Sequence, residues 1–227
     1  MIRLKTALAL LPLLCSAPLW ATTFVYVSNA ESGTVSRYQL NEANGSLQWR
    51  GDTPAGKKIM PLAASPDGKR LYGALRSPPY SIISWRVSGS HGDLQKLAVT
   101  PVAASFPWIT TDRRGRYLLA ASYDSDIVTS NRIDDKGIVT SQVTGEVKTG
   151  PHAHSVITDV SNHSLYVGNL GADRVLQYAF ADNGAITPLG AGFVQGEKNS
   201  GARHSVISPD NRFLYNLAEM SGTITQF

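Results

Sequence analysis

Cysteine is almost absent from this sequence. The chain of 227 residues contains one, Cys15, inside an apolar stretch close to its start. The sequence beyond that stretch therefore offers no disulfide, no thiol nucleophile and no cysteine ligand for a metal. A hydrophobic core and hydrogen bonds must hold the fold together.

Several signatures of common enzymes are missing as well. The sequence has no Gly-x-Ser-x-Gly motif, no glycine-rich phosphate loop and no paired carboxylates of the glycosidase type. His152 and His154 are spaced like metal ligands, but no acidic cluster adjoins them, so neither a metal nor another cofactor is expected. The 21 basic and 17 acidic residues are scattered, which indicates neither nucleic acid nor a membrane surface as a partner.

The first 21 residues have the layout of a secretory signal peptide. Arg3 and Lys5 supply a positive start, an apolar run follows, and the segment ends on small residues. This run is too short for a stable membrane anchor. We expect cleavage after Ala21, with Ala17 as the alternative, and a mature protein that is periplasmic or secreted and has no membrane segment.

A repeat with a period of 46 to 49 residues runs through residues 22–227, which we predict to form one domain. Its anchor is an apolar residue that in four units follows a turn sequence such as Ser-Pro-Asp-Gly: Leu71, Leu118, Leu165 and Leu214. Val25, at the start of the mature chain, supplies a fifth anchor. A second marker follows each anchor by 13 or 14 residues: Tyr38, Trp85, Asn131, Tyr178 and Phe227. Two markers that keep one period indicate a true structural repeat.

Each repeat unit has the pattern of short strands. Runs rich in β-branched and aromatic residues alternate with Gly, Pro, Asn and Asp turns, and no segment has a 3.6-residue period. Four strands and this period predict an all-β fold, a β-propeller of four-stranded blades. Val25 falls in the second strand of its unit and Phe227 in the third strand of the last one. We therefore expect an incomplete ring of about five blades, whose open edges carry an aggregation risk.

The repeat register predicts which distant residues share one face. His154 and Arg203 each lie 11 residues before an anchor, just ahead of an inner strand. Arg76, Tyr123 and Glu219 each lie five residues after an anchor, where the second strand of a blade returns to the same face. We expect these five side chains to converge at one mouth of the central channel. Two arginines, a histidine and a carboxylate around one cavity suit an anionic, oxygen-rich small molecule.

Four short motifs resemble those of a known family. They are Pro-His-Ala-His-Ser-Val at 151–156, Leu-Gly-Ala-Asp-Arg at 170–174, Gly-Ala-Arg-His at 201–204 and Leu-Ala-Glu at 217–219. The sequence resembles the seven-bladed β-propeller lactonases, which include propeller-type 6-phosphogluconolactonases and, more distantly, fungal carboxymuconate-lactonizing enzymes. The resemblance covers essentially all of the mature chain.

The resemblance implies seven blades, so that about two further repeats are expected beyond this sequence. It also implies His154, Arg203 and Glu219 as active-site positions, with Arg76 and Tyr123 beside them. Ala202 and Ala218 depart from the family pattern, which usually has Pro and Asn there.

The predicted roles follow from the chemistry of each side chain. His154 would act as a general base toward water, and Arg203 would hold an anionic group or stabilise the oxyanion. Glu219 would either orient His154, share its role or pair with Arg203. Arg76, Tyr123 and His204 are predicted to bind substrate. Because His152 and His204 flank the site positions on alternate sides of extended chain, packing between blades is the competing interpretation for both.

We therefore predict a lactone hydrolase that opens a sugar lactone to the sugar acid. The expected partner is a small anionic or sugar lactone, and the complete protein is expected to be a monomer. Two alternatives remain: a non-catalytic periplasmic propeller that binds a ligand or a protein, and an enzyme that forms a muconate-type lactone.

Overall fold

The computed structural model describes residues 22–227, which fold almost entirely into β-strands, as the repeat predicts. The predicted signal peptide at 1–21 lies outside the described residues. Within the described range the helical structure is one 3₁₀ turn, η1 (Leu170–Ala172). No helix in this range is long and apolar enough to cross a membrane.

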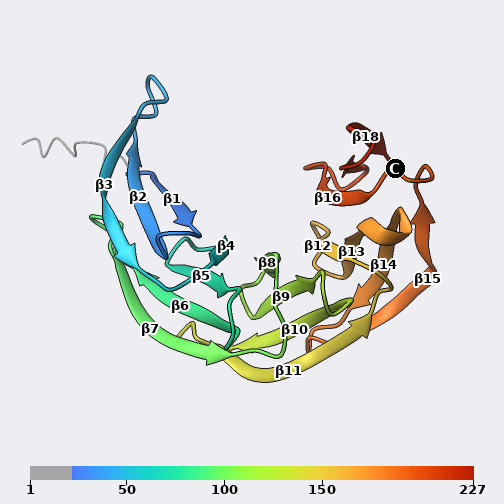
Figure 1. Ribbon diagram of the computed structural model, residues 1–227, viewed down its shortest axis with the longest axis horizontal. Coiled ribbons are helices and arrows are strands. Elements are labelled where there is room, and N and C mark those ends of the chain that lie inside the picture. Colours follow the sequence, from blue (N-terminus) through green and yellow to red (C-terminus); the bar gives the residue numbers. More distant parts are fainter. Residues whose placement is uncertain (1–21) are drawn as a thin grey trace, which may run out of the picture.

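The strands form five antiparallel sheets, the blades, which Figure 1 shows side by side along an open arc. The first blade contains β1 (Phe24–Asn29), β2 (Thr34–Leu40) and β3 (Leu47–Pro54). The second contains β4 (Ile59–Ala64), β5 (Arg70–Leu75), β6 (Ser81–Val87) and β7 (Leu94–Pro101). The third contains β8 (Trp108–Thr111), β9 (Tyr117–Ser122), β10 (Ile127–Ile133) and β11 (Val139–Lys148).

The last two blades continue the same order. The fourth contains β12 (Ala153–Thr158), β13 (Ser164–Asn169), β14 (Arg174–Phe180) and β15 (Ile186–Gln195). The fifth contains β16 (Ala202–Ile207), β17 (Leu214–Ala218) and β18 (Thr223–Gln226). The predicted all-β propeller architecture with five blades is confirmed. Within the described residues, the first blade has no inner strand and the last blade has three strands, as expected.

The two repeat markers are cross-strand partners. Leu71 pairs with Trp85 between β5 and β6, and the equivalent residues pair in the same way in the other blades. Directly opposed side chains lie on one face of a sheet and stabilise it as a pair. Trp85 is completely buried and packs with Leu71 in the core between the first and second blades.

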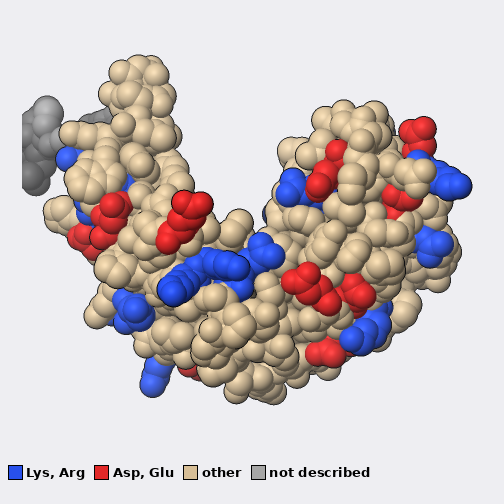
Figure 2. Space-filling view, viewed as in Figure 1, with Lys and Arg blue, Asp and Glu red and all other residues tan. Residues whose placement is uncertain are grey.

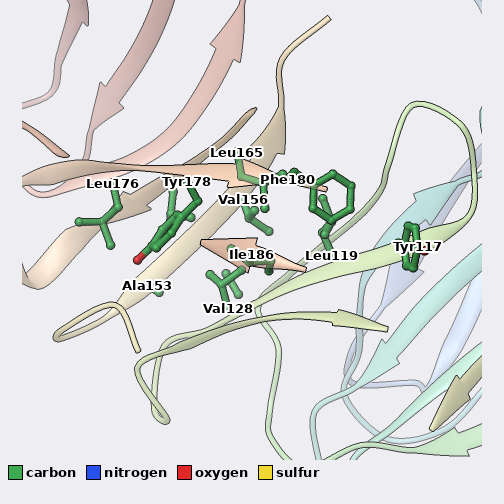
Figure 3. Packing of buried hydrophobic residues seen from close by; sticks show 12 residues of the cluster. Tyr117, Leu119, Val128, Ala153, Val156, Leu165, Leu176, Tyr178, Phe180 and Ile186 are labelled. Atoms are coloured by element: carbon green, nitrogen blue, oxygen red, sulfur yellow. The ribbon is translucent and has the colours of Figure 1, made fainter. Parts of the chain in front are cut away.

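The hydrophobic core consists of layers between neighbouring blades. In the layer shown in Figure 3, Tyr117, Leu119 and Val128 of the third blade meet Leu165 and Phe180 of the fourth. Burial of each such side chain contributes roughly 1.5–3 kcal/mol. Because every blade packs its face on the next, the inner strands stand side by side and their entrances reach one mouth.

Hydrogen bonds also join the blades at the opposite end, in the turns before the second strands. The Asn162 side chain donates to Asp112 Oδ2 at 3.0 Å and accepts the N–H of Arg113 at 2.8 Å. One repeat later, Asn211 donates to Asp159 Oδ2 at 3.2 Å. The turns of the fourth and fifth blades are thereby each joined to the turn of the blade before.

The last blade leaves an apolar face uncovered. Val206 is 61%, Leu217 39% and Ile224 71% exposed. Leu217 pairs with Ile224 across β17 and β18, so these two side chains lie on one face. Their opposite face, with Leu214, packs against Val175 of the fourth blade.

Candidate functional site

Two β-bulges bring the principal site residues to the mouth. Along β12, the neighbours of His154 on either side pair with adjacent residues of β13, so that His154 is the extra residue of a bulge. Arg203 is the extra residue of an equivalent bulge between β16 and β17. A bulge bends its strand and redirects the side chain that it carries. Both inner strands therefore use the same backbone device to present a site residue.

His154, Arg203 and Glu219 are in contact, as the register predicts. Arg203 Nε donates to His154 Nε2 at 3.2 Å. The same Nε lies 2.8 Å from Glu219 Oε2 in an ion pair whose two side chains are 36% and 43% exposed. Glu219 therefore pairs with Arg203, which was one of its predicted roles. Because the pair is partly solvated, its contribution to stability is about 1 kcal/mol or less.

The His154 imidazole is held neutral. Burial lowers its pKa from the ordinary 6.5 to about 4, and the positive charge of Arg203 acts in the same direction. Since Nε2 accepts a hydrogen bond, the hydrogen-bond pattern assigns the ring proton to Nδ1. Nδ1 is buried and has no hydrogen-bond partner. At neutral pH the ring thus carries a lone pair on Nε2, which is directed at the ion pair of Arg203 and Glu219.

Aromatic rings surround this imidazole. His204 lies with its ring centroid 5.1 Å from that of His154 and 4.8 Å from that of Trp108. Tyr123 approaches His154 edge-on at 6.1 Å. His204 and Tyr123, both predicted to bind substrate, are therefore placed beside His154. Burial and the charge of Arg203 lower the pKa of His204 as well.

His152 serves the neighbouring loop rather than the reactive centre. Its ring stacks on Tyr123, with centroids 4.1 Å apart and an interplanar angle of 11°. Its Nδ1 lies 3.3 Å from the Tyr123 carbonyl oxygen. This agrees with the packing interpretation of His152.

Arg76 is not part of the contacting group. Its Nε donates to Ser105 Oγ at 3.2 Å, and its backbone N–H donates to the carbonyl of Lys58 at 3.1 Å. Among residues 22–227, no carboxylate forms a salt bridge with Arg76. Figure 2 shows lysine and arginine side chains gathered over β4 and β5, whereas both charges are interspersed elsewhere on this face. Arg76 thus contacts Ser105 rather than His154, Arg203 or Glu219.

The register did not reveal the residues that let β16 approach β13. Ser155 donates its hydroxyl to the Arg203 carbonyl oxygen at 2.5 Å and is completely buried. A Cβ on Gly168 would lie 2.2 Å from that same oxygen, so a larger residue would push Arg203 away. A glycine inside a strand is the available sequence signal for such a close backbone approach.

Phe106 belongs to the core between the second and third blades. Trp108 is half-buried and donates its indole N–H to the Val156 carbonyl at 2.8 Å. Within the part of the chain that the structure describes, no group of three or more His, Cys, Asp or Glu residues is arranged to hold a metal.

The sequence is similar to proteins of a known family. The family described as Lactonase, 7-bladed beta-propeller matches residues 19–227. The chain belongs to this family. A 6-phosphogluconolactonase of Photorhabdus laumondii is 33% identical over 202 residues, which cover 88% of this chain and 60% of that protein. A 6-phosphogluconolactonase of Serratia proteamaculans is 31% identical, with 89% and 60% covered. This chain thus spans about 60% of the length of these curated relatives.

Solved structures show the same fold at lower identity. A putative 6-phosphogluconolactonase of Bacteroides uniformis superimposes with a TM-score of 0.79 at 21% identity, covering 91% of this chain and 64% of that one. A periplasmic gluconolactonase of Pseudomonas aeruginosa superimposes with a TM-score of 0.76 at 24% identity, covering 91% and 63%. The lactonase propeller is therefore the architecture of all five blades.

Proposed function

We propose that this chain supplies the catalytic mouth of a sugar-lactone hydrolase, with His154 as general base and Arg203 as the electrophilic group. The observation that carries the proposal is the contact between His154 Nε2 and Arg203 Nε at 3.2 Å, across two blades. Family membership and the curated 6-phosphogluconolactonases support the same class of reaction.

In the proposed reaction, His154, Arg203 and Glu219 each have one role. Once a water molecule replaces the Arg203 N–H at His154 Nε2, the neutral imidazole takes a proton from this water while the water oxygen attacks the lactone carbonyl carbon. Arg203 donates to the carbonyl oxygen as negative charge develops there. When the tetrahedral intermediate collapses, the ring C–O bond breaks and the alkoxide recovers the proton, so that water is added overall. Glu219 keeps Arg203 in place through its 2.8 Å ion pair.

The electrostatics favour hydrolysis over lactone formation by proton donation. An imidazole with a pKa of about 4 is unprotonated at neutral pH and can accept a proton at once. A general acid would need the imidazolium form, which burial and Arg203 both oppose.

The substrate is proposed to be a sugar lactone with an anionic substituent. Among residues 22–227, Arg76 forms no salt bridge with a carboxylate and remains available to such a group, as the predicted substrate-binding role requires. Arg203 is less available, because Glu219 already neutralises it. We propose a phosphate or carboxylate at the end of the substrate far from the lactone carbonyl.

A hydrolysis assay on two lactones tests this proposal. The purified protein is mixed with gluconolactone or 6-phosphogluconolactone, and ring opening is followed against the spontaneous reaction. We expect faster opening of the phosphorylated lactone, and a rise in its KM but not in that of gluconolactone for Arg76→Gln. Tight calorimetric binding of a lactone without any acceleration would contradict hydrolysis and support the binding alternative.

We further propose that the protein is exported by residues 1–21. Their charge and hydropathy pattern supports this. Mass spectrometry of protein produced in a bacterium with both membranes should find Thr22 as the first residue in the periplasmic fraction. Uncleaved protein confined to the cytoplasm would contradict export.

A further inference from the structure

Two aspartates that the proposed reaction does not use occupy equivalent places in neighbouring blades. Asp126 lies eight residues after Leu118, and Asp173 lies eight residues after Leu165. Both are in the turn that joins the second and third strands of a blade. Both adopt the left-handed backbone conformation, with φ of 54° and 55°.

Each carboxylate reaches across to the chain that enters the next blade. Asp126 Oδ1 accepts the backbone N–H of His152 at 2.7 Å. Asp173 Oδ1 accepts the backbone N–H of Gly201 at 2.8 Å, and its Oδ2 accepts that of Asn199 at 2.7 Å. His152 precedes His154 by two residues, and Gly201 precedes Arg203 by two residues.

We propose that Asp126 and Asp173 are positioning residues: each carboxylate fixes the entrance turn from which the next blade presents His154 or Arg203. Asp126 acts on His154, and Asp173 acts on Arg203. This inference concerns the geometry of the site, and it rests on the proposed function only for its kinetic readout.

The conformation of the entrance turns shows why they need an anchor. His152 has a φ of 63° and Gly201 a φ of 70°. This conformation is unfavourable for histidine and persists only where surrounding contacts hold it. A charged acceptor on the backbone N–H is one of the stronger contacts available. Directly after each turn comes the bulge that redirects the site residue, so the turn sets where that bulge begins.

The distribution of the carboxylate along the repeat supports a role at the site. In the first blade, Gly33 takes the equivalent place with a φ of 70°, and in the second blade Pro79 takes it. The inner strands that follow them present Met60 and Pro107, which have no ionisable group. Among the first four blades of the described chain, an aspartate occupies this position only where the next inner strand carries His154 or Arg203.

The repeat itself suggests the variant that isolates the carboxylate. Glycine occupies this place in the first blade, so Asp126→Gly and Asp173→Gly keep the backbone conformation and remove the acceptor. Asparagine tolerates the left-handed conformation and retains an oxygen acceptor. Asp126→Asn and Asp173→Asn are therefore the matched rescue variants.

The experiment combines lactone hydrolysis with an NMR titration of the His154 imidazole. For Asp126→Gly we expect kcat to fall about tenfold or more, because displacement of a reacting group by about an ångström has effects of this size. The His154 pKa should rise from about 4 toward 6.5, since burial is the main cause of its depression. For Asp173→Gly we expect kcat/KM to fall, because the contact between Arg203 and His154 is weakened. The two asparagine variants should have activities within about twofold of the wild type, because they retain an oxygen acceptor.

A turn aspartate on the opposite face provides the control. Asp134 Oδ1 accepts the backbone N–H groups of Lys136 and Ile138 in the turn after β10. Asp134→Gly should lower thermal stability without changing the His154 pKa.

The positioning role is overturned if both aspartate-to-glycine variants lose stability as Asp134→Gly does while kcat/KM and the His154 pKa stay at wild-type values. If the wild type hydrolyses neither lactone, the proposed function fails, but the NMR titration still tests the positioning.

Discussion

At the scale of the residue, the environment of His154 determines what it can do. Its Nε2 faces Arg203, its ring is enclosed by Tyr123 and His204, and its pKa is lowered to about 4. A base with this pKa is weak, but it is fully unprotonated at neutral pH. In the proposed reaction the site would therefore rely on Arg203 to make the lactone carbonyl reactive rather than on a strongly basic imidazole.

The pH dependence of hydrolysis follows from these shifts. As the pH falls, His154 remains neutral until the pH approaches about 4, so the acidic limb of kcat/KM should lie there and not near 6.5. Arg203→Gln removes a positive charge that opposes protonation, so the limb should move to higher pH, in addition to the loss of rate. Arg212→Gln, on the opposite face, is the charge-matched control. If the acidic limb of kcat/KM stayed at the wild-type pH in Arg203→Gln, electrostatic coupling between Arg203 and His154 would be contradicted.

At the scale of the element, the inner strands are alike in backbone and different in side chain. β12 and β16 each carry a bulge at the mouth, and each follows a left-handed entrance residue. The turns at their other ends are fastened by the hydrogen bonds of Asn162 and Asn211. One repeated scaffold can therefore hold a histidine in one blade and an arginine in the next at matched positions.

Breaking one of these fastenings should lower stability. In Asn162→Gly the left-handed φ of 67° is still accommodated, as Gly115 shows one blade earlier, but two hydrogen bonds to the third blade are lost. We expect the free energy of unfolding in urea to fall by about 1–3 kcal/mol. Asn183→Gly, at a turn asparagine that accepts only the nearby N–H of Ala185, should change it by less than about 0.5 kcal/mol. If both variants lost the same free energy of unfolding, the Asn162 hydrogen bonds would not be joining the third and fourth blades.

At the scale of the whole molecule, we expect the exposed apolar face of the fifth blade to influence how this chain behaves in solution. Leu217 and Ile224 pair on this face, and Val206 is also exposed. Exposed apolar faces of sheets promote association. The double variant Leu217→Thr with Ile224→Thr should lower light scattering at high protein concentration. Val160→Thr, at an isolated exposed residue in a turn, should not. Equal scattering from both would show that this face does not drive association.

Much of the fold was predictable because the chain repeats. Two markers with one period identified the blades, and the offset from the anchor correctly placed His154, Arg203 and Glu219 together. The offset could not reveal the bulges, since an extra residue in one strand is visible only against its partner. Arg76 shared the expected register but turned to Ser105, because its direction depends on a side-chain contact that no period encodes.

In the proposed function, His154 acts as the base for lactone hydrolysis at the mouth formed by the fourth and fifth blades. The most direct measurement compares the rate of lactone opening above the spontaneous rate for wild type, His154→Gln and His163→Gln, each checked for native circular dichroism. His163 lies in a turn on the opposite face. We predict that His154→Gln loses about a hundredfold or more of the catalysed rate and that His163→Gln keeps it. Equal rates in the two variants would contradict the account.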